Sequence, residues 1–142
     1  APMASLFFPS VSMADITVPL LFVLAEEDNS IMEIGNGFLR DNVADATPPV
    51  FQVDIADAGH WSVSDVCGLT EAFMAGCGSG VRHSEGSAGQ AFEYLPSAQG
   101  IAIVQRYLTT FMLAYVAGDE EALGRLEALP EQAGVSVTAR LD

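Results

Sequence analysis

The sequence has 142 residues, of which 50% are hydrophobic, and its mean hydropathy is +0.33. This length and composition suit one packed domain and exclude a chain that is disordered throughout. The net charge is −14, from 19 acidic and 5 basic residues, which argues against binding to nucleic acid or to an anionic membrane. No apolar run approaches the roughly 20 residues of a membrane-spanning helix. Residues 1–17 predict an irregular N-terminal segment without the pattern of a signal peptide.

Residues 18–66 have the pattern of a strand, a helix and a second strand. The apolar run 18–25 predicts a strand that is buried on both faces of a parallel sheet, and the alternation in 50–56 predicts the second strand. Between them, residues 30–43 show a broken helical pattern. The apolar residues that share a face of this helix are Ile31, Ile34 and Phe38.

The stretch 67–96 is expected to be a loop region. A short helix capped by Ser62 or Ser64 could lead into it. Residues 76–90 are rich in glycine and serine, which predicts an exposed, mobile loop with His83 as a surface residue.

The part 97–129 predicts two helices that close the domain. In residues 97–118, apolar residues recur at steps of three and four, and Gly118 is a plausible stop. Residues 119–129 open with a capping aspartate, which predicts the second, shorter helix. The tail after them could add an edge strand or remain loose.

The order of these elements is that of an α/β protein with a parallel sheet and right-handed crossovers. Two parallel strands are not stable alone, because both faces and both edges of such a sheet stay open. We therefore expect the chain to be the last third or half of a larger sheet, completed by strands that it does not encode.

The two cysteines, Cys67 and Cys77, stand ten positions apart. A disulfide that closes so short a loop would stabilise the fold by about 2–3 kcal/mol, and it would place the protein in an oxidising compartment, secreted or periplasmic. Two free thiols are the alternative. A metal site lacks support, since neither a CxxC spacing nor a second pair of histidines accompanies the cysteines.

Two polar residues follow the predicted strands at their carboxyl ends, Asp28 after the first and His60 after the second. Catalytic groups gather at this edge of open parallel sheets, and strands about 5 Å apart can bring the two side chains into contact. A carboxylate that holds one imidazole nitrogen leaves the other free to act as a base. Glu26 and Glu27 are alternatives for the acid, and each residue taken alone could be an ordinary turn residue. Trp61 either packs beside the pair or binds substrate by stacking.

In this order, the motifs resemble the C-terminal part of an α/β-hydrolase, in the region of the dienelactone hydrolases and the platelet-activating-factor acetylhydrolase-like esterases. The stretch ITVPLLFVLAEED is similar to the family's penultimate strand with its Gly-x-x-Asp turn, although Ala25 replaces the glycine. The stretch DAGHWS is similar to the family's Gly-His turn. The resemblance covers about residues 15–118, and it implies that Asp28 is the acid and His60 the histidine of a Ser-His-Asp triad.

The family's nucleophile is missing from this sequence, because no serine stands in a Gly-x-Ser-x-Gly frame. The resemblance implies that residues 1–142 form the C-terminal segment of one α/β-hydrolase domain, as one piece of a processed two-chain enzyme or as a truncated chain. A second chain would then carry the N-terminal half of the fold, the nucleophilic serine and the oxyanion hole. The implied reaction is the hydrolysis of carboxylic esters, with no metal or other cofactor.

Other functions remain open at this point. The same acid and histidine would serve a lactonase, a dienelactone-type hydrolase with a cysteine nucleophile, or an amidase. The chain could also be a non-catalytic binding module on a degenerate hydrolase fold, or a standalone binding protein. The nucleophile elbow separates these classes, since a Ser or Cys elbow on another segment would support an enzyme.

Overall fold

The computed structural model describes residues 13–67, 69, 74, 76–128 and 132–142. Residues 1–12 of the expected N-terminal segment and Leu129, the expected end of the last helix, lie outside these residues. In chain order the elements are the 3-10 turn η1 (Met13–Asp15), β1 (Leu20–Ala25), α1 (Met32–Asp45), β2 (Val50–Ile55), β3 (Ser79–Val81), β4 (Ala91–Glu93), α2 (Ser97–Tyr115), α3 (Glu120–Glu127) and β5 (Val135–Arg140).

The main sheet has three strands in the order β1-β2-β5. β1 and β2 run parallel, from the pair Leu20↔Val50 to the pair Ala25↔Ile55. β5 pairs with the other edge of β2 in the antiparallel direction. The sheet is therefore mixed: the predicted parallel pairing of the first two strands is confirmed, and the tail adds an antiparallel edge strand to it. The alternating VSVTAR sequence of the tail forms this edge strand.

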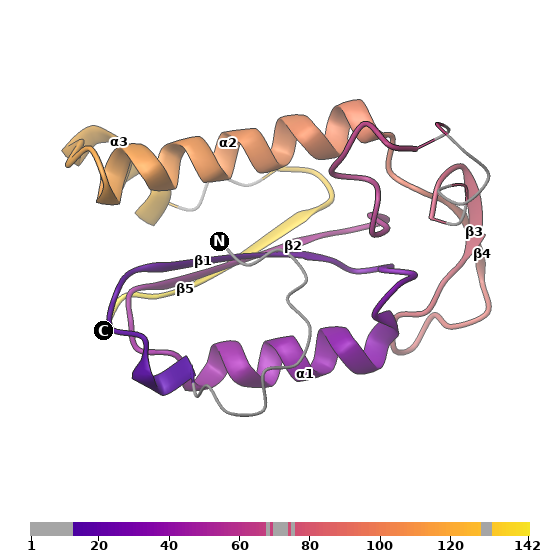
Figure 1. Ribbon diagram of the computed structural model, residues 1–142, viewed down its shortest axis with the longest axis horizontal. Coiled ribbons are helices and arrows are strands. Elements are labelled where there is room, and N and C mark those ends of the chain that lie inside the picture. The colour runs from indigo at the N-terminus through magenta and orange to yellow at the C-terminus, as the bar shows by residue number, and fades with distance from the viewer. Residues whose placement is uncertain (1–12, 68, 70–73, 75, 129–131) are drawn as a thin grey trace.

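Helices cover both faces of this sheet, with α2 and α3 on one face and α1 on the other (Figure 1). Because side chains alternate along a strand, neighbouring residues of β1 enter different cores. Leu21 packs with the residues under α2, whereas Leu20 and Phe22 pack with Val43 of α1. The larger core includes Leu21, Phe51, Val53, Ile55, Ile103, Tyr107, Phe111 and Leu126.

The three longer predicted helices are present, but α1 buries a different face from the expected one. Ile34 is 84% exposed and Phe38 is 43% exposed, while the buried residues of α1 are Asn36, Leu39 and Val43. The reason is polar: the Asn36 amide donates a hydrogen bond of 2.9 Å to the Ala25 carbonyl at the end of β1. This contact turns the asparagine side of α1, rather than its most apolar side, toward the sheet.

The loop region is more ordered than the glycine- and serine-rich composition suggested. β3 and β4 form a two-stranded antiparallel sheet, with Ser79 opposite Glu93, so the stretch 76–90, expected to be an exposed, mobile loop, contains one short strand, and its residues 82–90 form turns and irregular structure. His83, expected on the surface, is half-buried. Residues 62–67 form turns and bends instead of the start of a helix, because the Ser62 hydroxyl accepts the Gly59 N–H and thereby closes the turn around His60.

The disulfide between Cys67 and Cys77 is present, with 5.8 Å between the two Cα atoms. Several residues of the segment that it closes, 68, 70–73 and 75, lie outside the described part of the chain. None of the helices in the described ranges combines the length and the apolarity that crossing a bilayer requires.

Candidate functional site

The loops that follow β1 and β2 meet at the end of the sheet where the β3–β4 hairpin lies (Figure 1). Asp28 stands in the first loop and is only 4% exposed. Its Oδ1 accepts the backbone N–H groups of Ser30 at 2.8 Å and Ile31 at 3.0 Å. These two bonds make a turn in which a side-chain oxygen stands in for a backbone carbonyl, and they fix the direction of the carboxylate.

His60 stands in the second loop, after a sharp bend. Asp57 takes a positive φ of 57°, which an aspartate adopts more readily than most residues. The backbone N–H of His60 then donates to Oδ1 of Asn29, at 3.2 Å, in the neighbouring loop. The Ala58 carbonyl accepts the Glu27 N–H at 2.9 Å. The two loops are therefore joined by one backbone–backbone and one backbone–side-chain hydrogen bond, in addition to the contact between Asp28 and His60.

The structure brings the two predicted site residues together. Nδ1 of His60 lies 2.9 Å from Oδ2 of Asp28. A carboxylate without a proton can only accept a hydrogen bond, so in this contact a neutral imidazole would carry its proton on Nδ1 and keep the lone pair of Nε2. The His60 side chain is 25% exposed. This arrangement, with one ring nitrogen held and the other free, is what a general base needs.

A hollow of about 290 Å³ opens beside this pair, and Trp61 forms part of its wall. The Trp61 ring meets the His60 ring edge-on, with the ring centroids 4.5 Å apart and an interplanar angle of 89°. The other lining residues are Val23, Ala25, Asp28, His60, Val63 and Ser64. Trp61 therefore packs beside the histidine and also faces the hollow, which leaves its predicted role in substrate binding open.

Glu26 and Glu27, the alternatives for the acid, make other contacts. Glu27 is fully buried and accepts hydrogen bonds from Ser84 and from the backbone of His83. Burial alone would raise the pKa of Glu27, but these hydrogen bonds and the one from Arg82 outweigh it and lower that pKa. Burial, followed by the charge of Asp54, raises the pKa of Glu26. Asp28 is thus the carboxylate of this loop that contacts His60.

Two residues near the pair were not singled out from the sequence. Asn29 links the two loops, and a Cβ built on Gly76 would approach its Oδ1 to 2.1 Å, so the disulfide-closed segment packs tightly on this asparagine. Arg82 pairs with Glu27 and Asp57. A polar residue after Asp28 is ordinary turn chemistry, and no spacing marks an arginine in a glycine-rich stretch, so the sequence carried no signal for either.

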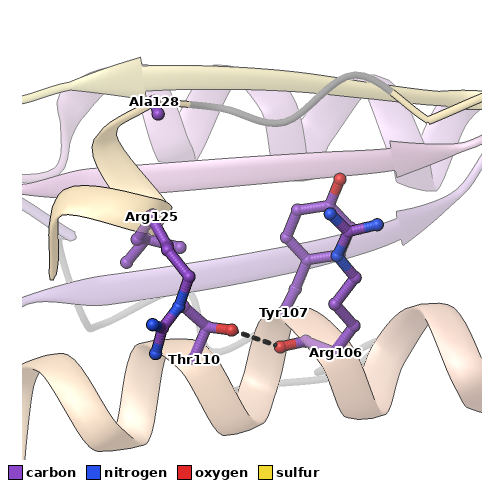
Figure 2. A pocket seen from close by; sticks show the side chains of 6 residues that line it. Arg106, Tyr107, Thr110, Arg125 and Ala128 are labelled. Carbon is purple, nitrogen blue, oxygen red and sulfur yellow. Dashed lines mark hydrogen bonds between the residues drawn. The ribbon is translucent and has the colours of Figure 1, made fainter. Parts of the chain in front are cut away.

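A second hollow, of about 190 Å³, lies between α2 and α3 (Figure 2). Tyr107 lines this hollow, and the Arg106 guanidinium lies 5.9 Å from the centre of the Tyr107 ring. Thr110 donates to the Arg106 carbonyl at 2.8 Å (Figure 2), and Arg125 is paired with Glu121 at 2.6 Å. No candidate acid-base pair lies among the residues that line this hollow.

Within the described ranges, no group of three or more His, Cys, Asp or Glu side chains is placed to hold a metal ion. The hollow at the end of the sheet is lined by a carboxylate, an imidazole and several apolar side chains. Comparisons of this chain with protein-family models, with curated proteins and with solved structures find no match.

Proposed function

We propose that this chain is the C-terminal part of an α/β-hydrolase that cleaves carboxylic esters, and that Asp28 and His60 are its acid and its base. The observation that carries the proposal is the 2.9 Å contact between Nδ1 of His60 and Oδ2 of Asp28. The order of the elements supports it as well, since the parallel strands β1 and β2 each lead into a loop that carries one member of the pair.

The reaction would run in two halves around His60. Nε2 of His60 takes the proton of a serine hydroxyl as the serine oxygen attacks the ester carbonyl, and His60 then gives this proton to the leaving alcohol. In the second half, His60 deprotonates a water molecule, which attacks the acyl-serine and releases the carboxylic acid, and the proton returns to the serine. Asp28 holds the tautomer and stabilises the imidazolium in both halves. This route uses no metal and no organic cofactor.

The serine would come from another polypeptide segment. No Gly-x-Ser-x-Gly sequence occurs among the 142 residues. In the described ranges, β1 pairs with β2 alone, so its outer edge is open, although Leu21 and Phe22 of this strand are each only 1% exposed. A strand that is buried on its faces and open along its edge is suited to receive a neighbouring strand. We propose that the segment with the serine supplies that strand.

The disulfide between Cys67 and Cys77 supports a place outside the reducing cytosol. We therefore propose that the enzyme is secreted or periplasmic. Cys67 and Cys77 follow His60 in the chain, and the segment that they close packs against the loop of Asp28 through Gly76 and Asn29.

Labelling with a fluorophosphonate, which modifies the nucleophilic serine of serine hydrolases, tests the proposal. The protein is purified with any polypeptide that accompanies it, and mass spectrometry under denaturing conditions identifies the labelled peptide. We expect the label on a polypeptide segment outside these 142 residues, and we expect His60→Ala to abolish labelling. A label on a serine of this chain, such as Ser64 in the hollow, would refute the separate nucleophile. Ester hydrolysis that survives in His60→Ala would refute the catalytic role of His60.

A further inference from the structure

A second charged cluster lies directly behind the candidate site. Its centre is Glu27, which is fully buried and precedes Asp28 in the chain. Glu27 accepts hydrogen bonds from the Ser84 hydroxyl and from the backbone N–H groups of His83 and Ser84. These donors all come from the segment between β3 and β4, which is far from Glu27 in the sequence. The cluster therefore docks the hairpin on the loop that carries the acid.

The Arg82 guanidinium joins this cluster to the other loop. One of its nitrogens, Nη1, lies 3.2 Å from Oε1 of Glu27, and the other, Nη2, lies 2.6 Å from Oδ1 of Asp57. Glu27 stands one residue before Asp28, and Asp57 stands three residues before His60. A single rigid guanidinium thus holds a carboxylate from each of the two loops. Its own position is fixed from the hairpin, where it lies 4.7 Å above the Phe92 ring.

We propose that Arg82 is a positioning residue of the candidate site, which sets the alignment of Asp28 with His60 by bridging Glu27 and Asp57. This inference rests on the proposed function. Arg82 does not touch Asp28 or His60 in any contact described above, so it acts through the loops that carry them. The planar fork of an arginine suits this task because it can hold two carboxylates at a fixed separation, which a lysine ammonium cannot do.

The closest alternative is that the cluster only stabilises the hairpin. The two roles differ in what they predict for the pair. A positioning role requires the hydrogen bond between Asp28 and His60 to loosen when the bridge is cut, even in protein that remains folded. A purely structural role lowers the melting temperature and leaves that hydrogen bond unchanged in the folded fraction.

The test replaces Arg82 by Ala and by Lys in the purified protein, together with any polypeptide that accompanies it. The readouts are the His60 Nδ1–H proton resonance, which is visible only while its hydrogen bond shields it from exchange with water, and kcat and KM for a short chromogenic ester. We expect R82A to lose the resonance and to lower kcat about 10- to 100-fold with little change in KM. We expect R82K to recover only part of the resonance intensity and only part of the kcat of the parent protein.

Arg125→Ala is the matched control, because Arg125 also pairs with a carboxylate, Glu121, but on the exposed surface of α3. It should leave the resonance and kcat unchanged. If R82A does not fold, Asp57→Asn removes one arm of the bridge and keeps the pair of Arg82 with buried Glu27. Asp57→Asn should then weaken the same resonance and lower kcat.

The proposal is overturned if folded R82A keeps both the resonance and the parent kcat. Where R82A does not fold, the same result for folded Asp57→Asn overturns it. In either case only a structural role for Arg82 would remain. The resonance does not depend on ester hydrolysis. If the parent protein hydrolyses no ester and R82A still loses the resonance, the proposed function fails while the positioning role of Arg82 stands.

Discussion

Asp28 divides its carboxylate between two tasks: Oδ1 holds its own loop and Oδ2 holds His60. Oδ1 accepts the N–H groups of Ser30 and Ile31, while Oδ2 lies 2.9 Å from Nδ1 of the imidazole. The same side chain thus builds the turn and orients the imidazole. Aspartate suits this double use, since its short side chain can reach the backbone two residues further along the chain.

The first prediction follows from this division. In Asp28→Asn, the remaining oxygen can still accept from Ser30 and Ile31, so the amide nitrogen faces His60. A donor at that place requires Nδ1 to become an acceptor, and the proton moves to Nε2, where it blocks the base. We expect ester hydrolysis to fall about 10³- to 10⁴-fold, with a small change in melting temperature. The ¹⁵N shifts of the ring report the tautomer directly.

Asp41→Asn is the control for this substitution, because Asp41 is exposed on α1. It should keep the parent rate. The tautomer must first be shown to have changed in Asp28→Asn. If this variant then hydrolyses the ester at a rate within a few-fold of that of Asp41→Asn, Asp28 does not serve catalysis.

The second prediction concerns the pH dependence of stability at Glu27. Hydrogen bonds from Ser84, His83 and Arg82 outweigh the effect of burial and lower the pKa of Glu27 below its ordinary 4.5. The unfolded chain therefore binds a proton more readily than the folded protein does. The contribution of Glu27 to stability is present above pH 4.5 and is lost as the pH falls through its folded value. Glu27→Gln should flatten the acid side of a plot of unfolding free energy against pH, measured by urea unfolding.

Its neighbour Glu26 provides the opposite case. Burial and the charge of Asp54 raise the pKa of Glu26 above 4.5. The folded protein then holds this proton more tightly, so the contribution of Glu26 is present below pH 4.5 and is lost as the pH rises through the folded value. Glu26→Gln should therefore raise the unfolding free energy at pH 7. If both variants shift the acid side of the plot in the same direction, the assignment of these pKa shifts is wrong.

The third prediction uses two helical glycines. A Cβ on Gly100 in α2 would lie 1.9 Å from the carbonyl oxygen of Ser62, in the turn of His60. Gly100→Ala should destabilise the fold, since neither backbone can yield without moving α2 or that turn. Gly124 in α3 has open space around it, so Gly124→Ala should stabilise by up to about 1 kcal/mol through helix propensity. Thermal unfolding of both variants checks the pair, and equal effects would contradict this packing.

The fourth prediction concerns the disulfide between Cys67 and Cys77. Its loss in the double variant Cys67→Ser/Cys77→Ser should lower the unfolding free energy by about 2–3 kcal/mol, because the unfolded chain regains the freedom of the closed loop. Urea unfolding with and without dithiothreitol measures the effect. The reductant should destabilise the parent protein and leave the double variant unchanged. A parent that does not respond to the reductant, although its thiols are shown to be reduced, would contradict the prediction.

β1, β2 and α2 could be predicted because the spacing of their apolar residues matches the faces that they bury. A strand covered on both faces, such as Leu20–Ala25, needs apolar residues at nearly every position. The contact of Asp28 with His60 was also within reach, since two parallel neighbours bring their following loops to one edge. At the site, the sequence could therefore predict the placement of two side chains.

Other features depended on polar contacts between distant segments, which periodicity does not record. The buried face of α1 is set by Asn36, a polar residue whose amide bonds the Ala25 carbonyl. The β3–β4 hairpin lies in a glycine-rich stretch, and it is docked by a bond from Arg82 to Glu27 across 55 positions. The sequence also did not indicate whether β5 would pair in the parallel or the antiparallel direction, because a segment with alternating apolar residues can join a sheet either way.

The pairing of β5 with β2 has a consequence for how quickly the chain can fold. This ladder joins Val50 to Arg140, which are 90 positions apart (140 − 50), and Ile55 to Val135, which are 80 apart (135 − 55). Closing such long loops costs entropy before the new contacts repay it, and folding rates fall as the mean separation of contacting residues rises. The central strand β2 gains its second neighbour only after residues 135–140 have been synthesised. On a ribosome, the helices can form early, but the sheet at the centre of the molecule must wait for its last strand.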